Sequence, residues 1–342
     1  IPRRFLQYRQ NGDPRKVLTQ ERDVLPSSLF STEVLVRWLA SPINPLDINK
    51  IQGAYAIKMP LPAVGGSEAM GKVVKVGSSV RDLSVGDSVV IYAMVCPTWA
   101  EHSIVDELEL IKIDSRLSPA AGATLLVNPP TAWIMLKKFG DLKQGDWVIQ
   151  NSANSGVGRA VIQLARAYGF RTINIVRDRP DLAEMKKELE DLGADVVLSE
   201  SEMAKTKGGR GLPGHPRLAL NGVGGRSCLQ IAAALQHGGT IVTYGGMSKQ
   251  PHELSTSSLV FNDVRAFGVA VGMWMREEVE GRAAEVHSML KELQALLIAG
   301  KLSPPPMDEW PLERFDEAIA RSLDGKHRKQ CFVMRPTTAA HL

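Results

Sequence analysis

Residues 150–179 read QNSANSGVGRAVIQLARAYGFRTINIVRDR, and this stretch decides the fold. A short apolar run at 146–150 predicts a buried strand that leads into a glycine-rich turn containing Gly156 and Gly158. The apolar periodicity after the turn predicts a helix, and residues 172–176 predict a second strand. A glycine-rich turn alone often reflects only tight packing, but strand, turn, helix and strand in this order are typical of a dinucleotide-binding unit. The first N–H groups of such a helix lack helical partners and can donate to a diphosphate.

The second predicted strand is followed by Arg177, Asp178 and Arg179, which bear on the choice of cofactor. A carboxylate about 20 residues beyond the glycines suits the ribose hydroxyls of NAD, whereas cations suit the 2′-phosphate of NADP. Two guanidinium groups can make charge-assisted, bidentate bonds to one phosphate. We therefore expect NADPH. The alternative is that both arginines belong to a solvated loop and that Asp178 binds the ribose.

Length and composition limit the class of protein. With 342 residues the chain exceeds one ordinary core, so two domains are expected. Its 44% hydrophobic and 23% charged residues are ordinary for a globular protein, and a net charge of +4 is too small to indicate nucleic-acid binding. No apolar run reaches the roughly 18 residues of a membrane span, so membrane insertion is not expected. The first residue is Ile1, which is compatible with a removed leader of unknown identity.

Cysteine usage points to a reduced protein. The chain has three cysteines, Cys96, Cys228 and Cys331, and they are far apart in the sequence. This spacing predicts neither a disulfide framework nor a cysteine-based zinc site.

The predicted elements change character along the chain. Residues 1–132 contain short β-type runs separated by turn residues, which predicts a β-rich domain. Residues 133–279 alternate strands and helices, which predicts an α/β domain with a doubly wound parallel sheet. Residues 280–342 contain an amphipathic helix that ends at Gly300 and a β-type run at 330–334, so this tail is expected to return to the first domain. The expected strands are 33–38, 71–76, 88–93, 109–113, 147–150, 172–176, 195–198, 218–221, 240–244 and 264–271, the expected helices include 181–192 and 228–235, and 205–216 is expected to be a surface loop.

Several motifs carry a resemblance over essentially the whole chain. They are INPLDINKIQGAY (43–55), VGGSEAMGKVVKVGSSV (64–80), VNPPTAW (127–133), NSGVG (154–158), INIVRDRPD (173–181) and YGGMSKQP (244–251). In these motifs and in its domain order the chain resembles the mitochondrial trans-2-enoyl-thioester reductases of the medium-chain dehydrogenase/reductase superfamily. The resemblance implies a Rossmann domain inserted into a GroES-like catalytic domain, NADPH as cofactor, enoyl-CoA or enoyl-acyl-carrier-protein as substrate, and a place in mitochondrial fatty acid synthesis.

The sequence departs from the zinc-dependent members of that superfamily. Where they carry Gly-His-Glu and a catalytic cysteine, this chain has Gly66, Ser67 and Glu68 and no cluster of cysteines and histidines. A metal is therefore not expected. Without a Lewis acid to polarise an oxygen, the hydride must go to an acceptor that conjugation has already activated, such as an enoyl thioester or a quinone.

The resemblance assigns the proton donor to Tyr55. In enoyl reduction, hydride reaches the β-carbon, negative charge builds on the thioester oxygen, and a proton must reach the α-carbon. An ordinary phenol, with a pKa of about 10, is protonated at neutral pH and can act as a general acid. The alternative is a loop tyrosine that only packs on a turn.

The resemblance also assigns the residues that bind the cofactor. Asn128 is assigned to the nicotinamide ribose and carboxamide, with a helix cap or Asx turn before Pro129 as the alternative. Trp274 is assigned to a place near the substrate, with a core tryptophan as the alternative, because its neighbours depart from the Phe-Trp-Leu pattern of the family. Pro130 also departs from the small or thiol residue of the family. The complete set is Asn128, Asn154, Ser155, Gly156, Val157, Arg177, Asp178, Arg179, Tyr244, Gly245, Gly246, Met247, Met273, Trp274, Met275, Arg276 and Lys329.

Two other functions stay open on the sequence. A zinc-free NADPH:quinone reductase would share the fold and the cofactor, so only the surroundings of Tyr55 and Asn128 distinguish it. A non-catalytic NADPH-binding protein is the second alternative.

The apolar, β-branched run at 264–271 predicts an edge strand that would be an aggregation liability if left uncovered. Reductases of the superfamily commonly pair at this strand, so the resemblance implies a homodimer.

Overall fold

The computed structural model of the protein describes residues 1–91 and 97–334, so Cys96 and the end of the expected strand 88–93 lie outside the described residues. The chain forms two compact units, Ile1–Leu126 with Pro304–Leu342, and Val127–Ser303. The expected limits differ at 127–132 and 280–303, which belong to the second unit. One reason is that helix α4 (Asn128–Lys138) runs unbroken through residue 132. The other is that helix α11 (Arg282–Ile298) is bound to the second unit by Glu292, which accepts from Trp133 Nε1 at 2.9 Å and from the Tyr168 hydroxyl at 2.8 Å.

The second unit is built on a six-stranded sheet in which every neighbouring pair is parallel. The strand order is β11-β10-β9-β12-β13-β14, so the order reverses between β9 and β12, and a doubly wound sheet binds its ligands at such a reversal. The fold class expected from the sequence is confirmed. The strands are β9 (Trp147–Gln150), β10 (Arg171–Val176), β11 (Val196–Ser199), β12 (Pro216–Asn221), β13 (Thr240–Thr243) and β14 (Arg265–Gly268).

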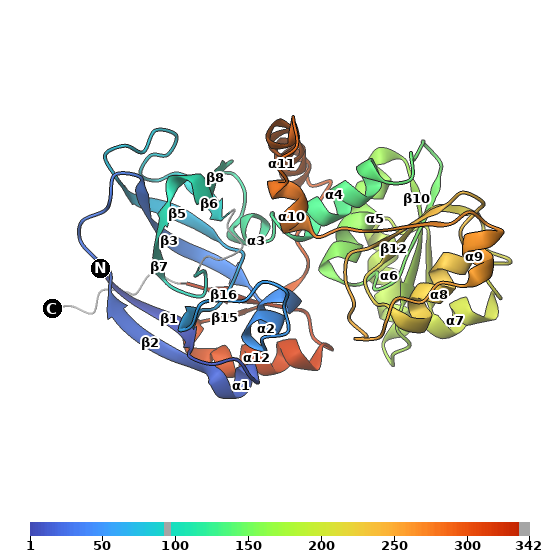
Figure 1. Cartoon of the computed structure of the whole chain (residues 1–342), viewed down its shortest axis with the longest axis horizontal. Coiled ribbons are helices and arrows are strands. Elements are labelled where there is room, and N and C mark those ends of the chain that lie inside the picture. Colours follow the sequence, from blue (N-terminus) through green and yellow to red (C-terminus); the bar gives the residue numbers. More distant parts are fainter. Residues whose placement is uncertain (92–96, 335–342) are drawn as a thin grey trace. The chain divides into compact units, whose positions relative to one another are not determined.

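Helices flank both faces of this sheet (Figure 1). The expected helix 181–192 is α6, and it ends at Gly193, whose φ of 113° is a conformation that favours glycine. In α11 the apolar stripe is buried at Val286, Met289, Leu290 and Leu293. Besides α4 and α11, the helices of this unit are α5 (Gly156–Tyr168), α6 (Leu182–Leu192), α7 (Glu200–Lys205), α8 (Gly225–Ala233), α9 (Thr256–Val260) and α10 (Val271–Arg276).

The expected edge strand 264–271 is shorter in the structure. Strand β14 ends at Gly268, and Val271 already begins α10. The prediction was wrong at this end because a short, mostly apolar run does not by itself distinguish a strand from the first turn of a helix.

The first unit combines two β-sheets. The larger has the order β15-β16-β3-β5-β6-β8 with β7 also paired to β3, and the smaller has the order β2-β1-β4. The C-terminal strand β16 pairs antiparallel with β3, so the tail returns to the N-terminal sheet. The strands are β1 (Pro2–Tyr8), β2 (Leu18–Val24), β3 (Glu33–Pro42), β4 (Ala63–Val64), β5 (Met70–Val76), β6 (Ser88–Ile91), β7 (His102–Asp106), β8 (Leu110–Ile113), β15 (Met307–Trp310) and β16 (Lys329–Val333), and the helices are α1 (Pro14–Val17), α2 (Pro45–Ile51), α3 (Pro119–Ala123) and α12 (Phe315–Asp324).

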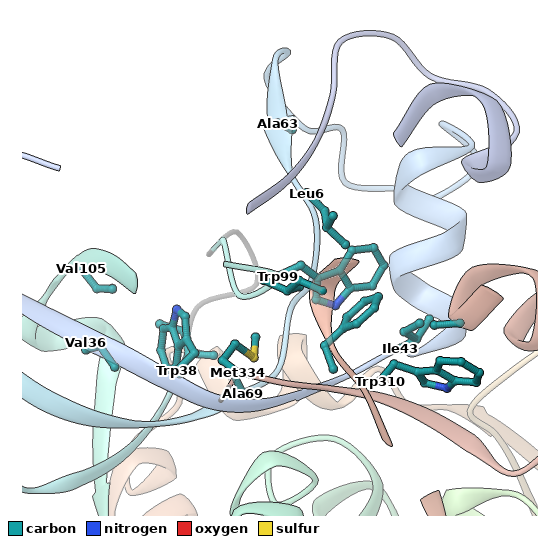
Figure 2. Packing of buried hydrophobic residues seen from close by; sticks show 14 of the residues in the cluster. Leu6, Val36, Trp38, Ile43, Ala63, Ala69, Trp99, Val105, Trp310 and Met334 are labelled. Atoms are coloured by element: carbon teal, nitrogen blue, oxygen red, sulfur yellow. The ribbon is translucent and has the colours of Figure 1, made fainter. Parts of the chain in front are cut away.

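Tryptophans dominate the core of the first unit. Figure 2 shows Trp38, Trp99 and Trp310 in one cluster of buried side chains, with Trp38 near Val36 and Trp310 near Ile43. Trp99 meets Phe332 of β16 edge to face, with ring centroids 5.3 Å apart. The indole N–H of Trp38 donates to Ser103 Oγ at 2.9 Å, so its polar atom is satisfied within the core. Residues far apart in the sequence therefore form the core against which α2 packs.

Candidate active site

The glycine-rich turn has the geometry expected of a phosphate-binding helix start. Ser155 is the N-cap of α5, and its Oγ accepts from the Gly158 N–H at 3.1 Å. The N–H groups of Gly156 and Val157 precede the first helical hydrogen bond and stay available to a ligand. A helix of 13 residues adds its dipole, which favours negative charge at this end.

A buried pair of asparagines fixes the strand ends around this turn. Asn151 follows β9 and Asn221 ends β12, and Asn151 Nδ2 donates to Asn221 Oδ1 at 2.8 Å. Asn151 Oδ1 accepts from the Gly222 N–H at 2.8 Å, and Asn221 Nδ2 donates to Thr243 Oγ1 at 3.1 Å. The ends of β9, β12 and β13 are thereby held in one hydrogen-bond network.

Two buried polar atoms beside the turn have no hydrogen bond of normal geometry within the described residues: Asn128 Nδ2 and the Tyr244 hydroxyl. Asn128 is 7% exposed and lies inside α4 rather than capping it, because the N-cap is Val127. Burial raises the pKa of Tyr244 to about 12, against a smaller opposite effect of Ser155, so the phenol is a neutral donor. Because unsatisfied buried donors are rare, this pair fits a cofactor that supplies acceptors.

The glycines next to these two atoms have no room for a side chain. A Cβ on Gly156 would lie 2.7 Å from Asn128 Nδ2, and a Cβ on Gly222 would lie 2.6 Å from the Tyr244 hydroxyl oxygen. Real Cβ contacts are essentially never this short. The two glycines therefore let the Asn128 amide and the Tyr244 phenol approach the ends of β9 and β12.

The residues after β10 favour a phosphate over a ribose hydroxyl pair. Asp178 Oδ2 accepts from the N–H and the Oγ of Ser201, at 3.1 and 2.9 Å, so its carboxylate is engaged at the start of α7. Arg177 is exposed, and Arg179 pairs with Asp181, with contacts of 2.5 and 2.8 Å. An ion pair exposed in this way contributes little, about 0–1 kcal/mol, so a phosphate can replace it. This arrangement weakens the alternative in which Asp178 binds the ribose.

The loops after β13 and β14 carry the remaining predicted cofactor residues of this unit. The Tyr244 N–H donates to the Asn221 carbonyl at 3.0 Å and the Met247 N–H to the Gly222 carbonyl at 3.1 Å, so Tyr244, Gly245, Gly246 and Met247 are fixed against the end of β12. Met273, Trp274, Met275 and Arg276 lie in α10. Trp274 is half-buried, and the Arg282 guanidinium lies 3.8 Å from its ring centroid, so it is not a tryptophan of the hydrophobic core.

Tyr55 lies in the first unit, in the turn after α2. Its N–H donates to the Asn49 carbonyl at 3.1 Å, and Gly53 with φ of 70° lets the chain reverse before it. The side chain is half-buried. Burial, and secondly the negative charge of Asp47, raise the pKa of Tyr55 above its ordinary value. The phenol is therefore protonated throughout the neutral range.

Lys329, the other predicted site residue of this unit, begins β16. Its Nζ donates to Asn44 Oδ1 at 2.5 Å, and Asn44 Nδ2 donates to Glu68 Oε2 at 3.0 Å. Ser67, which stands where zinc-dependent relatives have a histidine, donates to Asp47 Oδ1 at 2.6 Å. Burial lowers the pKa of Lys329, and the charges of Glu68 and Asp47 oppose that effect.

The sequence reasoning missed the residues that support the site: Asn44, Asn151, Asn221 and Arg282. For the two strand-end asparagines a signal was present, since each is a polar residue at the carboxyl end of an apolar strand. For Asn44 and Arg282 we find no comparable signal in the sequence. Within residues 1–91 and 97–334, no three or more His, Cys, Asp or Glu side chains are grouped to hold a metal ion. The same residues contain no helix with the length and apolar character needed to cross a bilayer.

A β-rich unit together with a Rossmann unit is the architecture of the medium-chain dehydrogenases and reductases, and the family models assign this chain to that class. Residues 31–114 match the alcohol dehydrogenase GroES-like domain, and residues 156–288 match the zinc-binding dehydrogenase domain. A mitochondrial enoyl-[acyl-carrier-protein] reductase of Caenorhabditis elegans is 50% identical over 97% of this chain and 96% of its own length. The chain belongs to the family of mitochondrial enoyl-thioester reductases.

Solved structures of this family are similar over nearly the whole chain. The mitochondrial 2-enoyl thioester reductase heterodimer from Candida tropicalis has a TM-score of 0.88 and 33% identity, covering 97% of this chain and 100% of that one. A complex of Etr1p with NADP and crotonyl-CoA has a TM-score of 0.88 and 31% identity, with the same coverage.

Proposed function

We propose that this protein reduces trans-2-enoyl thioesters with NADPH. The observation that carries the proposal is Tyr55, a half-buried phenol with a raised pKa, in a chain of the enoyl-thioester reductase family. The solved family complex holds NADP and crotonyl-CoA, which are a cofactor and a substrate of this kind. Its relatives are named as mitochondrial enzymes, and we propose the same location for this protein.

The chain's own residues bind the cofactor in three places. The N–H groups of Gly156 and Val157, with Ser155 beside them, donate to the diphosphate at the start of α5. Arg177 and Arg179 bind the 2′-phosphate after Arg179 leaves Asp181. The unsatisfied donors of Asn128 and Tyr244 fix the nicotinamide end, which fits their position at the ends of β9, β12 and β13.

NADPH, when bound, supplies the hydride that goes to the β-carbon of the enoyl group. Tyr55 then gives its hydroxyl proton to the α-carbon, because the raised pKa keeps that proton on the phenol until a strong base such as an enolate is formed. The phenolate that results regains a proton from solvent, since the side chain is only half-buried. The negative charge of Asp47 disfavours the phenolate and so favours its reprotonation from solvent after each turnover.

The competing function is quinone reduction with the same cofactor. A quinone takes up its protons on oxygen, which solvent can protonate without a positioned acid. Quinone reduction therefore does not require Tyr55 as a general acid. The direct test follows NADPH oxidation with crotonyl-CoA and with a benzoquinone side by side. We expect turnover with crotonyl-CoA, whereas turnover with the quinone alone would contradict the proposal. Binding of NADPH without oxidation by either acceptor would favour a non-catalytic role.

We also propose that the protein is a homodimer joined through β14. In the described part of the chain β14 is paired on one side only, by β13, and its four residues are exposed. Phe267 of this strand is 49% exposed, and Phe261, which precedes the strand in the sequence, is 80% exposed. An exposed apolar strand edge promotes association, and pairing with a second copy would cover it.

A further inference from the structure

A chain of four hydrogen-bonded groups supports Lys329 from inside the first unit. Lys329 itself is half-buried, whereas Asn44 and Glu68 beneath it are fully buried. Lys329 Nζ donates to Asn44 Oδ1, Asn44 Nδ2 donates to Glu68 Oε2, and Glu68 Oε1 accepts from the Leu126 N–H at 3.0 Å. The outer end of this chain, the ammonium group, is the part that a ligand can reach.

The chemistry of Glu68 fixes the orientation of the Asn44 amide. An ionised carboxylate can only accept hydrogen bonds, so the amide must turn its NH₂ group toward Glu68. The carbonyl oxygen of Asn44 then faces Lys329, and an ammonium group can only donate. Glu68 therefore decides whether the amide attracts or repels the ammonium.

The same carboxylate fixes the segment where the chain leaves the first unit. Leu126 ends the first segment of that unit, and Asn128 follows two residues later in the sequence. Glu68 Oε2 thus accepts from Asn44, which in turn binds Lys329, and Glu68 Oε1 accepts from the backbone that leads to Asn128.

We propose that Glu68 and Asn44 are positioning residues for NADPH: Glu68 orients the Asn44 amide, which holds the Lys329 ammonium toward the cofactor, and Glu68 also anchors the backbone before Asn128. This inference rests on the proposed function, in which Lys329 and Asn128 contact NADPH. A purely structural site of this size would be filled at least as stably by apolar side chains, because burying a carboxylate and an ammonium costs desolvation energy. Binding of a ligand by the Lys329 ammonium group therefore explains the buried Glu68 and Asn44 better than stability does.

The first test reverses one link of the chain. Glu68→Gln keeps the shape of the side chain and can still accept from the Leu126 N–H. Its NH₂ group, however, faces the NH₂ group of Asn44, and if the Asn44 amide turns over it presents that group to Lys329. We expect the Kd for NADPH, measured by fluorescence titration, to rise about tenfold to a hundredfold, the range for losing a hydrogen bond to a charged group.

A second variant restores the order of donors and acceptors. In Glu68→Gln with Asn44→Asp, the new carboxylate accepts both from the glutamine and from Lys329, and the net charge is unchanged. We expect this double variant to bind NADPH within about threefold of the parent, a difference below the effect of one charged hydrogen bond. The matched control is Ser103→Ala, which removes a buried hydrogen bond from Trp38 in the same unit and should lower the unfolding midpoint without changing the Kd.

The outcomes separate the inference from the proposed function. A parent protein that binds no NADPH contradicts the proposed function itself. If the parent binds NADPH, then a Glu68→Gln variant with the parent's Kd overturns the inference. A double variant that stays as weak as Glu68→Gln, or that fails to fold, also overturns it, because the restored hydrogen-bond order then does not matter. Should Glu68→Gln alone fail to fold, the Kd of the double variant decides.

Discussion

Tyr55 is the residue on which the proposed chemistry depends. Tyr55→Phe removes one oxygen and leaves the half-buried ring, so folding and NADPH affinity should barely change. Turnover with crotonyl-CoA should fall by about 10² to 10⁴, the usual contribution of a general acid. Quinone reduction by the same variant should fall much less, because solvent can protonate the product. Steady-state kinetics with both acceptors, under conditions where chemistry limits the rate, would measure this. A loss of less than about threefold with crotonyl-CoA would make Tyr55 a packing residue.

The pKa of Tyr55 predicts the alkaline behaviour of the same reaction. The acid form is the active one, and burial and Asp47 raise its pKa above the ordinary value of a phenol. Raising the pH therefore removes activity only above about pH 10, where an ordinary phenol would already ionise. A pH profile of kcat/KM for crotonyl-CoA should lack an alkaline limb from Tyr55 below that pH. In Tyr55→Phe, any alkaline limb that persists must come from another group.

Arg177 and Arg179 should determine the preference for NADPH over NADH. Each charge-assisted bond to the 2′-phosphate is worth about 1.5–3 kcal/mol, or roughly ten- to a hundredfold in affinity. Arg179→Ala should therefore weaken NADPH by that factor and leave NADH nearly unchanged, since NADH has no 2′-phosphate. Fluorescence titration of both cofactors measures the ratio. Equal affinities of the parent for NADPH and NADH would contradict the assignment.

The strand ends of the Rossmann unit depend on Asn221. Its Oδ1 accepts from Asn151 and from the N–H groups of Val223 and Gly224, at 2.8, 3.2 and 3.0 Å. Asn221→Ala removes the acceptor of the Val223 and Gly224 N–H groups and leaves Asn151 Nδ2 with Ser227 Oγ as its acceptor, which should lower the free energy of unfolding by about 2–4 kcal/mol and weaken NADPH binding. Thr243→Val is the control, because it removes the bond from Asn221 Nδ2 and an exposed contact with His252 but leaves the three bonds to Asn221 Oδ1 in place. Denaturant unfolding that gave equal losses for the two variants would show that the network has no special role.

Local sequence patterns predicted most helices and strands, but they did not predict which side chains far apart in the sequence are hydrogen-bonded. The expected strand 33–38 is the first part of β3, and the expected helix 181–192 is α6, which ends at a glycine, because periodicity and capping act over a few residues. Asn44 and Lys329 are 285 residues apart, and Asn151 and Asn221 are 70 apart, so only the folded chain pairs them. The attachment of α11 to the second unit is of the same kind, since Glu292 accepts from Trp133 across 159 residues.

Metal dependence is a property of the whole protein that can be tested directly. Ser67 is bound to Asp47 where zinc-dependent relatives have a histidine ligand, and a serine hydroxyl is a poor ligand for zinc. Exhaustive chelation followed by gel filtration should leave the rate of crotonyl-CoA reduction unchanged. Stoichiometric zinc whose removal abolished turnover and whose return restored it would contradict this.

Association through β14 should make the protein a dimer. Phe267 lies in this exposed strand and touches Phe139 with ring centroids 5.6 Å apart, so its outer side can meet a second copy. Light scattering at micromolar concentration should give about twice the chain mass of 37.3 kDa. Phe267→Lys should shift the protein toward monomer, because a charge buried at a strand interface lacks a partner. Phe30→Lys is the matched control, since Phe30 is 80% exposed in the first unit, and dissociation by both variants alike would place the interface elsewhere.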